Sequence, residues 1–189
     1  IRRGVLAPER FLPIAEMSGL IVQIGQHVLD MACGQIAGWR GLGLAVPRIS
    51  INVSARQCMD ERFPSLLVQT LERHGIGPTA IDLEITESCF LDRGAAGKVL
   101  PAIKKAGVSL TLDDFGTGYA NLTNLRHEAI DAIKIDRAFV NEIVGRPDSG
   151  AIARAVVALG RSQGLKVIAE GVENQRQVDT LREMGCHAC

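Results

Sequence analysis

The sequence has no excess of charge of either sign, and this absence limits the partners that it can attract. Its 189 residues contain 21 Lys and Arg and 21 Asp and Glu. Without a strong net field, the chain does not recruit DNA, RNA or anionic lipid by charge alone. We therefore expect no nucleic-acid polymer among its partners. An anionic ligand would need a local positive charge, such as a metal ion or a single lysine in the binding site.

Long apolar segments are also missing. No apolar run approaches the roughly 18 residues that a membrane-spanning helix needs, and no signal peptide opens the chain. The first residue is Ile1 rather than Met, so we expect the chain to be part of a longer polypeptide. The expected location is the cytoplasm, and an anchor in the inner membrane is left open for the parent protein.

The cysteines lack the even number and the regular spacing of a disulfide framework. There are five of them, which favours a reducing compartment. Only Cys186 and Cys189 have CxxC spacing, and no second pair accompanies them as a zinc site would require. The four histidines follow no metal-binding pattern either.

The chain does contain a regular alternation of short apolar strands with amphipathic helices. This pattern predicts an α/β protein with a parallel sheet covered by helices, and the length suits one domain. The predicted strands are 48–53, 81–85, 108–112, 132–136 and 165–169, and the predicted helices are 8–17, 21–39, 63–74, 94–106, 149–163 and 172–184.

Polar side chains recur at the carboxyl ends of these strands: Asn52, Glu84, Asp113-Asp114, Lys134 with Asp136, and Glu170. They follow one another about every 30 residues, as the units of a (β/α)₈ barrel do, and such barrels place their chemistry at this rim. An open doubly wound sheet has similar spacing, so the spacing alone leaves both architectures open. The five units present are also fewer than a closed barrel needs.

The residue types at this rim favour a site for hard metal ions. Converging carboxylates repel one another unless a cation lies between them, and oxygen ligands favour Mg²⁺, Mn²⁺ or Ca²⁺ over zinc. The adjacent Asp113 and Asp114 are candidates for a two-ion centre of the kind used in displacement at phosphorus. Lys134 is placed to orient a water or a phosphate oxygen, and Glu170 to accept the proton of the water.

Several of the polar residues at the strand ends also have a purely structural interpretation. Asn52 is a candidate helix cap, and Glu84 and Asp136 are each candidates for an ion pair with a neighbouring basic residue. The joint occurrence at successive strand ends favours a functional site, because charged residues are rarely buried without partners.

Five segments match a known family. The segments "SINVSARQ", "LEITES", "LTLDDFGTGYANL", "IKIDRAFV" and "VIAEGVE" resemble, in order and spacing, the motifs of the EAL-domain cyclic di-GMP phosphodiesterases. The opening "APERFLPIAEMSGLI" is similar to the segment that follows the Glu-Ala-Leu motif in that family. The resemblance covers residues 1–189 as one EAL-type domain and implies a TIM-like (β/α)₈ barrel, incomplete in this chain.

The resemblance implies hydrolysis of cyclic di-GMP to linear pGpG with water and two Mg²⁺ or Mn²⁺ ions. It implies that Asp113 is shared between the ions and that the loop after Asp114 contacts a homodimer partner. The implied roles are metal ligands for Asn52, Glu84, Asp113 and Asp114, orientation of the water for Lys134, general base for Glu170, loop stabilisation for Glu87, and substrate or loop contacts for Gln57, Gly116, Thr117, Gly118 and Asp136.

The sequence departs from the family pattern at both ends and in the loop. It contains no Glu-Ala-Leu motif, and hence lacks the metal ligand and the substrate-binding arginine found there. The final strand of the family should begin near Gly185-Cys186, just before the chain stops, and Ala120 and Asn121 replace two serines. We expect residues 1–189 alone to be poorly stable and weakly active or inactive.

Two other functions stay open at this point. One is a catalytically inactive EAL-type domain that acts as a cyclic di-GMP receptor or as a protein-interaction module, alongside other domains of the parent chain. The other is an unrelated Mg²⁺-dependent barrel enzyme. The phosphodiesterase is favoured because the chain retains the implied metal ligands and catalytic residues: Asn52, Glu84, Asp113, Asp114, Lys134 and Glu170.

Overall fold

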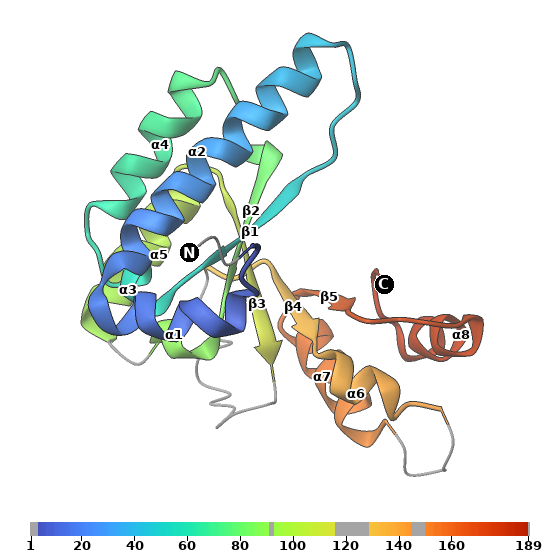
Figure 1. Ribbon diagram of the computed structural model, residues 1–189. Coiled ribbons are helices and arrows are strands. Elements are labelled where there is room, and N and C mark those ends of the chain that lie inside the picture. The colour runs from blue at the N-terminus through green and yellow to red at the C-terminus, as the bar shows by residue number, and fades with distance from the viewer. Residues whose placement is uncertain (1–3, 91–92, 116–128, 145–149, 189) are drawn as a thin grey trace. The chain divides into compact units, whose positions relative to one another are not determined.

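Strands and helices alternate along the chain as the sequence predicts (Figure 1). The computed structural model describes residues 4–90, 93–115, 129–144 and 150–188. Its sheet has the strand order β1-β2-β3-β4-β5, which is the order of the chain. The strands are β1 (Ile49–Val53), β2 (Ile81–Ile85), β3 (Ser109–Phe115), β4 (Ala132–Ile135) and β5 (Lys166–Ala169). The predicted α/β class is confirmed.

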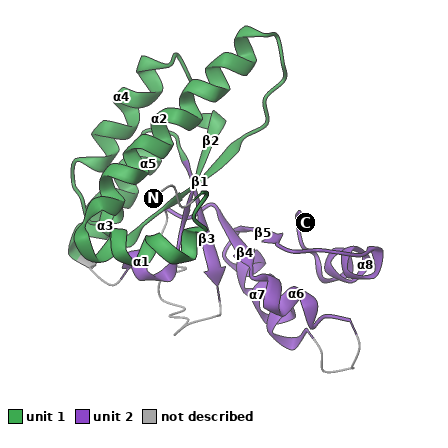
Figure 2. Cartoon of the chain, viewed as in Figure 1, with its two compact units in different colours: residues 1–82, 92–108 green, residues 83–91, 109–189 purple. Residues whose placement is uncertain are grey.

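The chain divides into two units, which are described separately (Figure 2). Unit 1 comprises residues 1–82 and 92–108, and unit 2 comprises residues 83–91 and 109–189. β2 therefore contributes its first two residues to unit 1 and its last three, including Glu84, to unit 2.

Unit 1 consists mainly of helices that bury one apolar face each. In α4 the buried positions Phe63, Leu67, Thr70 and Leu71 recur at helical spacing, which is the signature of an amphipathic helix. α2 contacts α1, α4 and β1. No helix in the described part of the chain is long and apolar enough to cross a membrane. The helices of this unit are α1 (Pro8–Ser18), α2 (Leu20–Gly41), α3 (Ala55–Cys58), α4 (Phe63–Arg73), the 3₁₀ helix η1 (Pro78–Ala80) and α5 (Arg93–Lys105).

Unit 2 contains the parallel strands that carry the candidate site. β4 pairs in parallel with β3 on one side and with β5 on the other, and all four of its residues are buried. α7 packs its buried residues against β4 and β5. The helices of this unit are the 3₁₀ helix η2 (Glu87–Phe90), α6 (Arg137–Asn141), α7 (Ala151–Ser162) and α8 (Gln175–Met184).

β3 contains an irregularity at the paired aspartates. Leu112 is opposite Ile133 and Phe115 is opposite Ile135, so Asp113 and Asp114 together face Lys134 alone. Two residues opposite one is the geometry of a β-bulge. Asp114 accordingly has a positive φ of 53°. The sequence prediction ended this strand at Leu112, and the strand instead continues through the bulge to Phe115.

The chain returns to the sheet after α8. Gly185, with φ 89°, ends the helix, and His187 then donates its backbone N–H to the carbonyl of Val167 at 2.8 Å. Ala188 forms a parallel bridge with Ile168 of β5. This bridge is isolated, and residues 185–188 form no strand, so the strand expected to begin near Gly185-Cys186 stays a prediction.

Two glycine substitutions are expected to have opposite effects on the stability of the fold, because Gly160 of α7 packs closely on β5 whereas Gly38 of α2 has open space around it. A Cβ at Gly160 would lie 2.6 Å from Val167 Cγ2, whereas a Cβ at Gly38 in α2 meets no atom within 4 Å. We expect Gly160→Ala to lower the free energy of unfolding by about 1–3 kcal/mol through overpacking. Gly38→Ala should raise it by about 0.5–1 kcal/mol through helix propensity. Urea unfolding of both variants measures this, and equal effects would contradict the packing.

Candidate active site

The candidate site is centred on the ammonium group of Lys134, in the middle of β4. The Lys134 side chain is only 10% exposed. Its Nζ lies 2.9 Å from Glu84 Oε2 and 3.4 Å from Asp113 Oδ1, and it also contacts the carboxylate of Glu170. One cation thus joins carboxylates that come from three other strands or strand ends of unit 2.

The parallel register explains why residues distant in sequence meet here. Ile135 is paired with Ala169, and the backbone N–H of Glu170 donates to the carbonyl of Ile135 at 3.1 Å. Glu170 therefore lies immediately beyond the end of β5, next to the end of β4. The carboxyl ends of parallel strands lie at one edge of a sheet, which is where α/β proteins bind ligands.

The charges around Lys134 determine its protonation. Burial alone would lower the pKa of Lys134. The hydrogen bonds with Glu170 and Glu84 and the charge of Asp113 outweigh burial and raise this pKa above its ordinary value. Lys134 is therefore a permanent cation at neutral pH, and it acts through its charge and its N–H donors.

Asp114 lies in a less favourable electrostatic environment. Partial desolvation raises its pKa, and the negative charges of Asp113, Asp136 and Glu170 add to the rise. The backbone N–H of Asp114 donates to Asp113 Oδ1 at 2.9 Å, which fixes the Asp113 carboxylate in the bulge. The site therefore has more negative charge than Lys134 neutralises.

Two further predicted residues flank this cluster within unit 2. Asp136 accepts a hydrogen bond from the backbone N–H of Ala138 at 2.8 Å and so caps the N-terminus of α6. Glu87 begins η2, which contacts β3. The predicted loop residues Gly116, Thr117 and Gly118 lie outside the described residues.

The other predicted residues, Asn52 and Gln57, belong to unit 1. Asn52 is an exposed residue of β1, and the N-cap of the following helix α3 is Ser54 rather than Asn52. Gln57 is 3% exposed, and its Oε1 accepts from the backbone N–H of Ser54 at 3.2 Å. This capping box accounts for Gln57 as a structural residue of α3.

The donor chemistry of the cluster fits a divalent cation. Glu84, Asp113 and Asp114 offer carboxylate oxygens, the ligands that Mg²⁺ and Mn²⁺ prefer, and the excess negative charge favours a cation. Among the described residues, no three Asp, Glu, His or Cys side chains converge closely enough to hold an ion. In this structure the carboxylates of Glu84, Asp113 and Glu170 converge on the ammonium of Lys134 instead.

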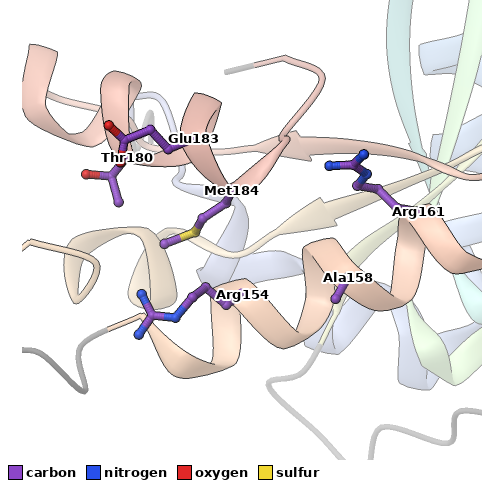
Figure 3. A pocket seen from close by; sticks show the side chains of 6 residues that line it. All are labelled: Arg154, Ala158, Arg161, Thr180, Glu183 and Met184. Atoms are coloured by element: carbon purple, nitrogen blue, oxygen red, sulfur yellow. The ribbon is translucent and has the colours of Figure 1, made fainter.

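A separate groove lies between α7 and α8. It has a volume of about 590 Å³ and contains none of the predicted site residues. Figure 3 shows that its walls come from these two helices, with Ala158 between two arginines of α7. The lining residues are Arg154, Ala158, Arg161, Thr180, Glu183 and Met184. The titratable cluster, not this groove, carries the candidate chemistry.

Sequence reasoning did not single out Arg137 or Gln177, although both contact the segment after Glu170. Arg137 Nη2 donates to Glu173 Oε1 at 2.9 Å, and Gln177 Oε1 accepts from the backbone N–H of Glu173 at 2.7 Å. The pair Asn174 and Gln177 has the spacing of a capping box, a local signal that predicts the contact of Gln177. Nothing local in the sequence predicts the contact of Arg137.

Comparison with known proteins identifies the family. The family model "EAL domain" matches residues 1–189. The chain belongs to the EAL domain family. EAL domains have a TIM-like barrel fold, so the predicted barrel architecture is confirmed and the doubly wound alternative is excluded.

The relatives of this EAL domain include enzymes of several bacteria. The bifunctional diguanylate cyclase/cyclic di-GMP phosphodiesterase MucR of Pseudomonas aeruginosa is 42% identical over 99% of this chain and 27% of its own length. The cyclic di-GMP phosphodiesterase PdeR of Escherichia coli is 40% identical over 97% of this chain and 28% of its own length. This chain thus spans about a quarter of the length of these relatives.

Solved structures agree with this assignment. The complex of the PaMucR phosphodiesterase with c-di-GMP has a TM-score of 0.88 and 42% identity, and the match covers 97% of this chain and 75% of that one. The EAL enzyme Bd1971, with cAMP and cyclic di-GMP bound, has a TM-score of 0.89 and 30% identity over 97% of this chain and 51% of that one.

The electrostatics of Asp114 predict a pH-dependent gain in stability for Asp114→Asn in EDTA. A raised pKa means that the folded state disfavours the ionised carboxylate, so the charge of Asp114 lowers stability above its ordinary pKa of about 3.9. Asn removes this cost and, like Asp, tolerates positive φ. We expect a higher melting temperature than the parent at pH 7 and no difference below about pH 3.9.

Asp60→Asn provides a control of opposite sign. The hydrogen bond from Arg62 lowers the pKa of Asp60, so its ionised form stabilises the folded state above the ordinary pKa. Asp60→Asn should therefore lower the melting temperature at pH 7. If Asp114→Asn also lowers the melting temperature at pH 7, the charge of Asp114 does not destabilise the folded state and the prediction is wrong.

Proposed function

We propose that this EAL domain hydrolyses cyclic di-GMP to linear pGpG. The observation that carries the proposal is the convergence of Glu84, Asp113 and Glu170 on Lys134 at the carboxyl edge of the sheet. Membership of a family whose relatives include cyclic di-GMP phosphodiesterases at 40–42% identity supports this substrate.

The proposed roles follow from the chemistry of each group. The permanent charge of Lys134 and its N–H donors suit it to orient the attacking water or a phosphate oxygen. Glu170, at the end of β5 and in contact with Lys134, takes the proton from this water as the water oxygen attacks phosphorus. The bond from phosphorus to one ribose oxygen then breaks, and this oxygen takes up a proton from solvent water, which opens the ring to the linear product with a free hydroxyl.

Two Mg²⁺ or Mn²⁺ ions are the proposed cofactors, in agreement with the divalent-metal dependence that is general among EAL phosphodiesterases. Glu84, Asp113 and Asp114 of unit 2 are the proposed ligands, and Asn52 of β1 remains a predicted one. Bound divalent ions supply positive charge to the phosphate oxygens and lower the pKa of a bound water. The excess of carboxylates over Lys134 supports this assignment.

The remaining expectations stay predictions. For the residues, these are stabilisation by Glu87 of the loop after Asp114, and substrate contacts by Asp136 and Gln57. For the whole protein, they are a domain that extends over residues 1–189, a homodimer through the loop that contains Gly116, Thr117 and Gly118, further domains in the parent chain, and a cytoplasmic location. The alternative function, a receptor without turnover, stays in competition because the same edge of the sheet would bind the ligand in both cases.

Turnover of cyclic di-GMP by the natural polypeptide that contains residues 1–189 tests the proposal. We expect linear pGpG with Mg²⁺ or Mn²⁺ and none in EDTA. Glu170→Ala should reduce kcat by about 10²–10⁴-fold, the usual loss on removal of a general base. Glu72→Gln, an exposed carboxylate of α4 in unit 1, is the control and should leave the rate unchanged.

The other outcomes separate the alternatives. Binding of cyclic di-GMP without pGpG in any variant would identify a receptor. Turnover that persists in Glu170→Ala would keep the phosphodiesterase but remove Glu170 from the proton transfer.

A further inference from the structure

The short segment that carries Glu170 has no regular secondary structure of its own. Residues 170–174 connect β5 to α8, and Gly171 turns the chain there with a positive φ of 67°. A general base must be held in a fixed position relative to the atom that it deprotonates, since a misplacement of about 1 Å can cost about a hundredfold in rate. The contacts that fix this segment are therefore of functional interest.

Arg137 makes two contacts with this segment. Its aliphatic stem lies over Gly171, where an added Cβ would be 2.5 Å from Arg137 Cγ and 2.9 Å from Cβ and Cδ. Its guanidinium Nη2 donates to Glu173 Oε1 at 2.9 Å. Arg137 thus holds the residue directly after Glu170 by packing and the residue two further on by an ion pair.

Gln177 of α8 provides a second link between the segment after Glu170 and helix α6. Gln177 is 4% exposed, and its Oε1 accepts from the backbone N–H of Glu173 at 2.7 Å and of Asn174 at 3.2 Å. Its Nε2 donates to the carbonyl of Val140 in α6 at 3.4 Å. Both ends of the segment after Glu170 are therefore tied to α6.

α6 itself is fixed to the strand of Lys134. It begins at Arg137, directly after its cap Asp136 and three residues after Lys134, and its residue Val140 is completely buried. A displacement of α6 would thus change the position of Glu170 relative to Lys134. We propose that Arg137 is a positioning residue that holds Glu170 against Lys134 through its contacts with Gly171 and Glu173. This inference rests on the proposed function, in which Glu170 is the general base.

The kinetic test uses the natural polypeptide that contains residues 1–189 and substitutions of Arg137. The Arg137 side chain is 65% exposed, so Arg137→Ala should fold normally. We expect kcat for cyclic di-GMP to fall about tenfold with KM changed less than about twofold, because the substitution affects the reacting geometry and not substrate binding. Arg137→Lys, which keeps an aliphatic stem and a charge, should recover most of the lost rate.

Arg62→Ala is the matched control. It also removes an exposed arginine that pairs with a carboxylate at 2.9 Å, but in unit 1. It should leave kcat and KM unchanged. An unchanged kcat in Arg137→Ala, or a rise in KM alone, would overturn the positioning role.

Hydrogen exchange of the protein in EDTA provides a second readout that needs no turnover. Arg137→Ala should speed exchange of the backbone amides of residues 171–174 and leave those of β4 unchanged. If the parent protein hydrolyses no cyclic di-GMP, the proposed function fails, and the exchange rates alone decide whether Arg137 holds this segment. Unchanged exchange at residues 171–174 would then overturn the inference.

Discussion

One buried cation holds the candidate site of this EAL domain together. The ammonium of Lys134 contacts Glu84, Asp113 and Glu170, which come from β2, β3 and the end of β5. Without a cation these carboxylates would repel one another at the edge of the sheet. The same arrangement leaves Lys134 permanently charged and leaves net negative charge at Asp114. The site thereby combines a fixed positive donor with an attraction for divalent cations, and its groups come from β2, β3, β4 and the end of β5.

Backbone geometry determines which carboxylates reach this cation. The bulge in β3 sets Asp113 and Asp114 together opposite Lys134, and Asp114 has a positive φ in this bulge. On the other side, the register of β4 and β5 brings Glu170 next to the end of β4. The contacts of Arg137 and Gln177 then fix the segment after Glu170. The catalytic groups of the proposed reaction are therefore positioned by the backbone of three strands and by one short helix.

Most of the regular elements were predictable because their signals are local. The periodicity of α2 and α4 and the apolar runs of β2 and β4 predicted these elements to within two residues at each end. Helix α6 was missed because five residues show no period, and α8 begins three residues later than predicted because Asn174 caps it. The capping pattern at Asn174 would have corrected the start of α8, and the one at Ser54 would have indicated α3, which was also missed. The candidate residues were predictable as strand ends, but the bulge and the contact of Arg137 with Gly171 depend on tertiary packing that no local pattern encodes.

In this EAL domain the charge of Lys134 stabilises the clustered carboxylates. The decisive measurement is a double-mutant cycle in urea with EDTA, made from Lys134→Met, Glu84→Gln and the double variant. We expect Lys134→Met alone to lower the free energy of unfolding by about 3–5 kcal/mol, since it leaves buried carboxylates without a cation. Glu84→Gln should then restore part of that loss. Lys98→Met, which breaks an exposed pair with Glu61, should cost less than about 1 kcal/mol. A loss of stability in Lys134→Met no larger than that in Lys98→Met, with additive effects in the cycle, would show that Lys134 does not stabilise these carboxylates.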